Sequence, residues 1–130
     1  MTAVAQGAPT VVSRPAGESL VLKQFCFVKQ SGDTFVACSA ATDLPTGVLQ
    51  NKPANGIPAE VVVIGPTKVV ADIAITAGAL IGTSADGQAD PKIAGDTSDY
   101  VAGKALEAAT GAGQIIEAIV NCATPYLIAT

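Results

Sequence analysis

Hydrophobic and polar positions alternate in short runs from Leu20 onward, and turn-forming residues separate the runs. The first such region, residues 20–39, reads LVLKQFCFVKQSGDTFVACS and has β-branched and aromatic residues on both sides of Ser-Gly-Asp. Runs of this kind around a short glycine-containing turn are typical of β-hairpins. The pattern therefore predicts two strands joined by a tight turn at residues 31–33.

Two further regions show the same pattern. Residues 60–75, EVVVIGPTKVVADIAI, are rich in Val and Ile and are interrupted by Gly65-Pro66, which predicts a strand, a turn and another strand. Residues 78–91, GALIGTSADGQADP, predict another pair of strands around Asp86-Gly87.

Residues 100–120, YVAGKALEAATGAGQIIEAIV, are ambiguous, because Ala, Leu, Glu and Lys favour helix. An internal echo resolves the ambiguity. Residues of the same kind recur 56 or 57 positions apart in three places, namely Thr46-Gly47 and Ala102-Gly103, Gly56 and Gly113, and Glu60 and Glu117. Pro53 and Pro58 forbid a continuous helix in the first copy, since proline lacks a backbone donor. The second copy is therefore also expected to form a strand, a loop and a strand.

These patterns predict an all-β fold, either a small β-sandwich or a barrel-like domain of short strands. We expect one β domain over residues 20–130, with two related units at 20–65 and 76–121. The alternative is that compositionally simple β sequence produces such echoes by chance. Residues 1–19 are small and polar, with prolines and glycines, and predict an extended N-terminal arm or a disordered tail.

Composition narrows the function. The chain has 130 residues, seven basic and eleven acidic, for a net charge of −4, and Arg14 is its only arginine. This balance argues against binding to nucleic acid or to anionic lipid. No apolar stretch approaches the roughly 20 residues that a membrane helix needs, and the N-terminus does not resemble a signal peptide, so we expect a soluble protein.

The three cysteines, Cys26, Cys38 and Cys122, are widely spaced, and two of them lie inside apolar runs. We interpret them as reduced core residues of a protein made in the cytoplasm, because free cysteine packs like a small hydrophobe. A disulfide between Cys26 and Cys38 across a hairpin is the alternative.

Candidate chemistry is sparse. The chain has no histidine, which removes the commonest general acid/base and the histidine-based zinc sites. The acidic stretch from Asp86 to Asp99 lacks the ligand spacing of an EF-hand, and Glu60 and Glu117 are better explained as outward-facing strand residues. Lys68 lacks the acidic or methionine neighbours of a lipoyl or biotinyl lysine. We therefore expect no catalytic residues, no cofactor and no metal.

Residues 75–120 resemble the small capsid decoration, or cement, proteins of tailed bacteriophages. The similar features are a small-residue strand start, an Asp-Gly turn, a Thr/Asp-rich loop, a Gly followed by Ala-Leu-Glu-Ala, a glycine turn and a final aliphatic strand. In this sequence they are Ala77–Ile81, Asp86-Gly87, Asp96–Asp99, Gly103–Ala108, Gly111–Gly113 and Ile115–Val120. Through the internal echo, the resemblance extends more loosely to residues 41–65.

The resemblance implies a structural virion protein, made in the bacterial host cytoplasm, that binds the outer capsid surface as a trimer and clamps neighbouring major capsid proteins together. We expect the N-terminal arm to reach a neighbouring subunit or the shell, and its deletion over residues 2–19 to leave the fold intact. The candidate contact residues are Val11, Val12 and Arg14 in the arm and Tyr126, Leu127 and Ile128 in an apolar C-terminal cluster. The alternatives are a tail, baseplate or head-fibre module, a non-viral β binding domain such as a sugar-binding one, and an enzyme.

Overall fold

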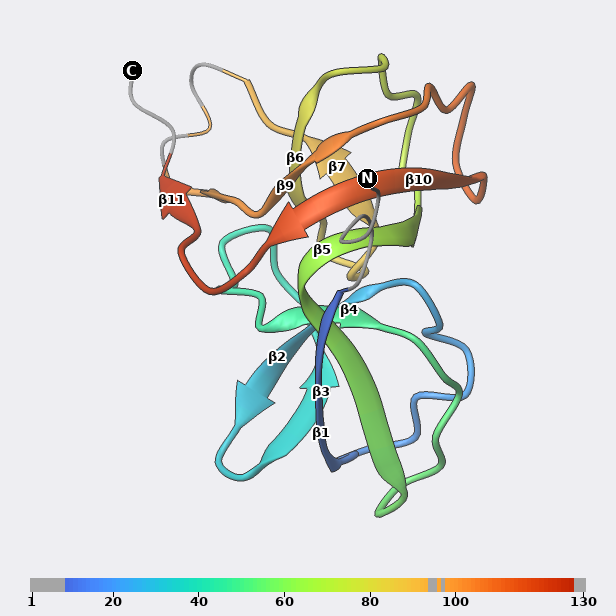
Figure 1. The fold of residues 1–130 in the computed structure, drawn as a ribbon, viewed down its shortest axis with the longest axis vertical. Helices are drawn as coiled ribbons and strands as arrows, with labels where there is room; N and C mark the ends of the chain where they lie inside the picture. The colour runs from blue at the N-terminus through green and yellow to red at the C-terminus, as the bar shows by residue number, and fades with distance from the viewer. Residues whose placement is uncertain (1–8, 94–95, 97, 128–130) are drawn as a thin grey trace, which may run out of the picture.

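The computed structural model describes residues 9–93, 96 and 98–127, and every regular element within them is a β-strand (Figure 1). The predicted all-β class is confirmed. The strands are β1 Thr10–Pro15, β2 Phe27–Ser31, β3 Thr34–Ala37, β4 Gly47–Leu49, β5 Pro58–Val70, β6 Leu80–Thr83, β7 Ala89–Pro91, β8 Tyr100–Val101, β9 Gly103–Ala105, β10 Ile115–Asn121 and β11 Tyr126–Leu127.

One antiparallel sheet of nine strands organises the molecule, in the order β3-β2-β4-β5-β10-β9-β6-β7, with β1 also paired to β5. A separate two-stranded sheet joins β11 to β8. The long strand β5 is central, because its first half pairs with β1 and β4 and its second half pairs with β10. Figure 1 shows β5 running from the lower half of the molecule into the upper half.

The strand order contains the same arrangement twice. In the first half β2 pairs with β3 and β4, and β4 pairs with β5; in the second half β6 pairs with β7 and β9, and β9 pairs with β10. We call residues 10–64 the N-terminal unit and residues 65–121 the C-terminal unit. The pairing pattern of β2 to β5 thus recurs in β6 to β10.

The register of the two units also agrees. Val48 pairs with Val62 in the N-terminal unit, and Lys104 pairs with Ile119 in the C-terminal unit. Both pairs follow from the residue spacing of the internal echo. Backbone hydrogen bonds at corresponding places match as well, as in Phe25 N to Leu49 O at 2.7 Å and Gly78 N to Ala105 O at 2.8 Å. The same pairs of corresponding residues are therefore joined in both units.

Each unit begins one strand earlier than the predicted boundaries. β1 pairs antiparallel with the first half of β5, and the second half of β5 pairs antiparallel with β10. In the repeated arrangement, β1 therefore takes the place that residues 65–70 take in the C-terminal unit. Ala16 N donates to Ile57 O at 2.9 Å, and its counterpart Ala71 N donates to Gln114 O at 2.8 Å. Residues 10–15 are thus a strand of the domain instead of an arm outside it. Their small polar composition hid the strand, which depends on pairing with β5 more than on local propensity.

The predicted turn at Gly65-Pro66 is not formed, because β5 is continuous from Pro58 to Val70. Gly65 has a φ of +122°, a conformation that side chains disfavour. This glycine lets the strand change direction between the units without ending. Pairing on both sides of this point keeps the strand intact despite the proline, which cannot donate to the ladder.

The predicted hairpins are confirmed. β2 and β3 are joined at Gly32-Asp33, and β6 and β7 enclose Asp86-Gly87. Gly32 and Gly87 have φ values of +60° and +79°, which explains the requirement for glycine at both turns. Residues 100–120 contain strands β8, β9 and β10 and no helix, as the internal echo predicted.

Two groups of buried aliphatic residues form the core. One lies within the N-terminal unit and consists of Ala16, Leu20, Val28, Phe35, Ala37, Leu49, Ala59 and Val61. The other fills the C-terminal unit, including Ile81, Ile116 and Val120, and extends to Phe27, Cys38, Val48 and Val62 of the N-terminal unit. The two units therefore share a hydrophobic contact and form one packed body.

Candidate interaction surface

Three of the predicted contact residues lie on β1. Val11 and Val12 are 48% and 37% exposed, and Arg14 is exposed while its Nε donates a hydrogen bond to the Asp33 carbonyl oxygen at 3.0 Å. In the described part of the chain, β1 has β5 as its only strand partner. Its outer side is an edge that could accept another strand.

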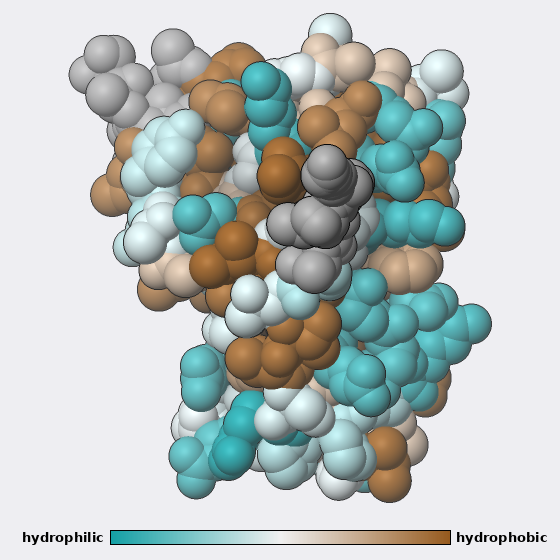
Figure 2. Space-filling model, viewed as in Figure 1, coloured by the Kyte–Doolittle hydropathy of each residue, from teal (hydrophilic) through white to brown (hydrophobic). Residues whose placement is uncertain are grey.

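The other predicted contact residues belong to the C-terminal segment. Tyr126 and Leu127 form β11, pair with β8, and are 52% and 49% exposed, so they do not join the core. Ile128 lies outside the described residues. Figure 2 shows hydrophobic side chains at the surface over β1 and near the end of β10.

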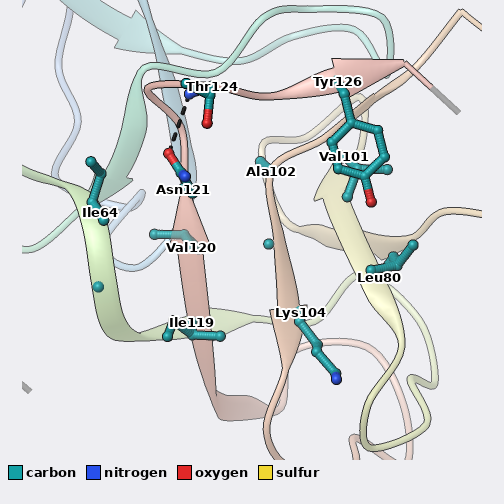
Figure 3. A pocket seen from close by; sticks show the side chains of 12 residues that line it. Ile64, Leu80, Val101, Ala102, Lys104, Ile119, Val120, Asn121, Thr124 and Tyr126 are labelled. Carbon is teal, nitrogen blue, oxygen red and sulfur yellow. Dashed lines mark hydrogen bonds between the residues drawn. The ribbon is translucent and has the colours of Figure 1, made fainter.

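An open groove of about 550 Å³ lies mainly on the C-terminal unit and is completed by Ile64 and by the segment after β10. One side is formed by Ile64 and Ile119, and the other by Leu80, Val101 and Tyr126, as Figure 3 shows. The remaining lining residues are Gly65, Ala102, Gly103, Lys104, Val120, Asn121 and Thr124. Lys104 is the only charged residue among them, so the surface suits a largely apolar partner that brings one negative or polar group.

The local sequence explains the shape of this groove. Alternate residues of β10 face opposite sides, which leaves Ile119 on the exposed side while Ala118 and Val120 are buried. At the end of the strand, the side-chain oxygen of Asn121 accepts hydrogen bonds from the Ala123 and Thr124 N–H groups, both at 3.2 Å. This turn redirects the chain so that β11 pairs with β8 and places Tyr126 at the groove.

Sequence reasoning found Tyr126 but missed the aliphatic residues of the groove, Ile64, Leu80 and Ile119. The sequence did contain a signal for Ile119. Residues two apart in a strand face the same side, so Ile119 must lie on the same outward face as Glu117 in the strand Ile115–Asn121. No comparable signal marks Leu80, which precedes three buried residues.

Glu60 and Glu117 are both exposed and face outward from their strands, as predicted. In the sheet register Glu117 lies opposite Lys68, which is also exposed. Opposite charges at directly paired strand positions are favourable. These residues belong to the charged outer face of the sheet.

The acidic stretch has a structural role that the sequence did not reveal. The side chain of Lys92 is fully buried, and its Nζ lies 2.9 Å from Asp99, 3.2 Å from Asp90 and 3.0 Å from the Thr83 carbonyl oxygen. A buried ammonium group requires such partners. Among the described residues, no group of three or more His, Cys, Asp and Glu side chains could hold a metal ion.

All three cysteines are buried and free, which confirms the interpretation as core residues and shows that Cys26 and Cys38 are not bonded. Burial raises the pKa of the Cys38 and Cys122 thiols to about 12, and it also raises the pKa of Cys26. The thiols therefore remain protonated at neutral pH, which makes them poor nucleophiles.

No helix in the described part of the chain is long and apolar enough to cross a membrane. No protein-family model matches the chain, and no curated protein matches its sequence. Among solved structures, the fold is similar to the N base of the head fibre protein gp8.5 of bacteriophage phi29, with a TM-score of 0.65 and 20% sequence identity. The similarity covers 95% of this chain and 100% of that one. The two chains thus share a fold over most of this chain and all of the other.

Proposed function

We propose that this chain is a structural component of a bacteriophage virion that attaches to the outer surface of the head. The observation that carries the proposal is the fold shared over the full length of a head-fibre base. Because the similarity covers the whole of the head-fibre base and includes both units of this chain, we expect this chain to use the fold in a similar way, for attachment to a phage head.

The character of the surface supports a binding role over a catalytic one. Exposed apolar side chains occur on β1, in the groove and on β11, and Leu22 and Ile93 are exposed elsewhere on the surface. Two carboxylates of the acidic stretch, Asp90 and Asp99, are instead engaged in ion pairs with the buried Lys92. Contiguous exposed apolar residues commonly mark sites of protein association. We expect the major capsid protein to be the partner, and β1, with Val11 and Val12, to be the edge offered to it.

Two roles on the head fit this attachment. As a head-fibre base, the chain would anchor a projecting structure, which requires only tight binding. As a cement protein, it would also clamp neighbouring capsid subunits, and binding that occurs only to the assembled shell stabilises that shell by mass action. The resemblance of residues 75–120 to cement proteins, which extends more loosely to residues 41–65, supports the second role.

Copy number separates the two roles. Quantitative mass spectrometry of purified particles would give the ratio of this chain to the major capsid protein. A ratio near parity favours cement, a small fixed number of copies favours a fibre base, and absence from particles would refute the proposal. A cement protein should also raise the temperature at which the head is disrupted, when heads with and without the chain are compared.

The contribution of β1 can be tested with purified heads that lack the chain. Val11→Lys should weaken binding in a co-sedimentation assay, because it places a charge on the apolar edge, while Lys52→Ala at another exposed position should bind normally. Deleting residues 2–19, which the sequence suggested would leave the fold intact, would remove β1 from the sheet. Point substitutions are therefore the appropriate test.

A further inference from the structure

The contact between the two units uses a different surface from each. The N-terminal unit contributes a face with Phe27, Val48 and Val62, which are at most 2% exposed. The C-terminal unit contributes the turn between β6 and β7: Gly87 O accepts a hydrogen bond from Phe27 N at 2.6 Å, and Asp86 O accepts one from Lys23 Nζ at 3.1 Å. Such a contact is heterologous, so among the described residues of a single chain one surface of each kind remains uncovered.

The C-terminal unit has a face that corresponds to the buried face of the N-terminal unit, and this face is the groove. In the register shared by the two units, Phe27, Val48 and Val62 correspond to Leu80, Lys104 and Ile119. All three counterparts line the groove (Figure 3), where Leu80 is 39% and Ile119 is 45% exposed. The groove is therefore the face that the N-terminal unit buries, repeated on the C-terminal unit and left open.

The uncovered counterpart of the β6–β7 turn is the β2–β3 turn. Gly32 and Asp33 occupy the tip of that hairpin and are exposed. Figure 1 shows the β2–β3 hairpin projecting from the lower end of the molecule, away from the C-terminal unit. One chain thus carries an open groove on one unit and a free turn on the other.

We infer that the groove binds a second copy of this chain, which inserts its β2–β3 turn in the way that the β6–β7 turn contacts Phe27. The inference rests on continuity with the contact between the units and holds whether or not the chain belongs to a virion. The charges are compatible with this occupant. The position that Val48 occupies in the N-terminal unit is occupied by Lys104 in the groove. The inserted turn would bring the carboxylate of Asp33 to this lysine, and the two opposite charges would attract each other.

The C-terminal segment strengthens this choice. Tyr126 forms one wall of the groove and would be buried by the inserted turn, as aromatic residues at the centre of protein interfaces commonly are. Because the contact is heterologous, its repetition gives a closed ring or an open filament, and either assembly follows from the same surface.

The first test is the mass of the purified chain in solution, measured by light scattering after size exclusion and by analytical ultracentrifugation. The wild-type chain should self-associate in a concentration-dependent manner. Ile119→Lys should raise the dissociation constant by about 100-fold or more, because it buries a second cation beside Lys104. Ile115→Lys is the matched control, since Ile115 is 52% exposed on the same face of β10 but outside the groove, and it should associate like wild type.

A mixing experiment tests the head-to-tail arrangement. Ile119→Lys blocks the groove and leaves the turn intact, whereas Asp33→Arg blocks the turn and leaves the groove intact. Each variant alone should be monomeric, and an equimolar mixture should form a one-to-one dimer, because one complementary pair of surfaces remains. At concentrations low enough for wild type to be monomeric, thermal unfolding of each variant should match that of wild type, since both positions are exposed.

Three results would overturn the inference. The first is a wild-type chain that stays monomeric up to its solubility limit, and the second is an oligomer that Ile119→Lys leaves unchanged. The third is a mixture of the two variants that remains monomeric. If the monomeric chain binds phage heads and Ile119→Lys abolishes that binding, the occupant of the groove is a shell protein and not a second copy.

Discussion

The N-terminal and C-terminal units share strand order and register, yet they fill their interiors differently. At corresponding core positions the N-terminal unit has Phe35 and Leu49, where the C-terminal unit has Ala89 and Ala105. The C-terminal unit compensates by packing against residues of its neighbour, including Phe27. One backbone arrangement therefore supports both a self-contained core and a core that depends on an adjacent unit.

The comparison teaches that burial in this protein is set by the neighbouring unit as much as by position in the sheet. Val62 and Ile119 occupy the same place in their strands, but one is 2% and the other 45% exposed. The difference arises because the C-terminal unit covers the first residue and nothing in the described chain covers the second. Substitutions at matched positions can test this account.

The largest difference is expected between Phe27 and its counterpart Leu80. Phe27→Ala should lower the free energy of unfolding by about 3–5 kcal/mol, because it removes a fully buried ring at the contact between units. Leu80→Ala should change it by less than about 1 kcal/mol in the monomer, since the side chain is partly exposed. Denaturant titration of both variants measures the difference, and equal losses would contradict the assignment of the two faces.

The next effect concerns two lysines that anchor the loops before β4 and β8. Lys92→Ala should destabilise the protein by about 2–3 kcal/mol, because it removes the buried partner of Asp90 and Asp99. Lys29→Ala should cost about 0.5–1 kcal/mol, since the ion pair between Lys29 and Asp43 is partly exposed. Chemical denaturation would rank the two, and a larger effect at Lys29 would contradict the role given to Lys92.

The glycines that open β4 and β9 should be equally intolerant. A Cβ atom on Gly47 would overlap Val61 and the Val62 carbonyl oxygen, and one on Gly103 would overlap the corresponding Ile119 carbonyl oxygen. Each Gly→Ala substitution should cost about 2 kcal/mol, because a strand must shift to admit the methyl group. Gly111→Ala is the control, since its added Cβ meets no atom within 4 Å, and it should be nearly neutral in thermal unfolding.

The smallest effect depends on pH. Partial burial alone would raise the pKa of Asp43, but hydrogen bonds from Ser39 N, Lys29 Nζ and Ala40 N outweigh it and lower the pKa below its ordinary value of 3.8. A carboxyl with a lowered pKa stabilises the fold above its unfolded pKa, and this contribution disappears as the pH falls through the folded pKa.

Asp43→Ala should therefore cost about 1 kcal/mol at neutral pH and almost nothing in strong acid. Urea titrations at several pH values would measure this convergence. A cost that stays constant with pH would show that the ionised carboxylate is not the stabilising form.

The sequence predicted the locally encoded features well. The turns at Gly32 and Gly87 were visible because glycine supplies a backbone conformation that other residues disfavour. The echo of Gly47 and Gly103 correctly converted an ambiguous segment into strands. The strand β1 and the continuity of β5 through Pro66 were not predictable, because both depend on pairing with distant segments.

The amino-acid sequence by itself determined the all-β class and the hairpin turns, because both are encoded in neighbouring residues. Only the tertiary structure decided where each unit begins, which residues the units bury against each other, and that the matching face of the C-terminal unit is an open groove. The physical reason is that turn and strand preferences act over a few residues, whereas burial depends on which surfaces meet across the whole chain.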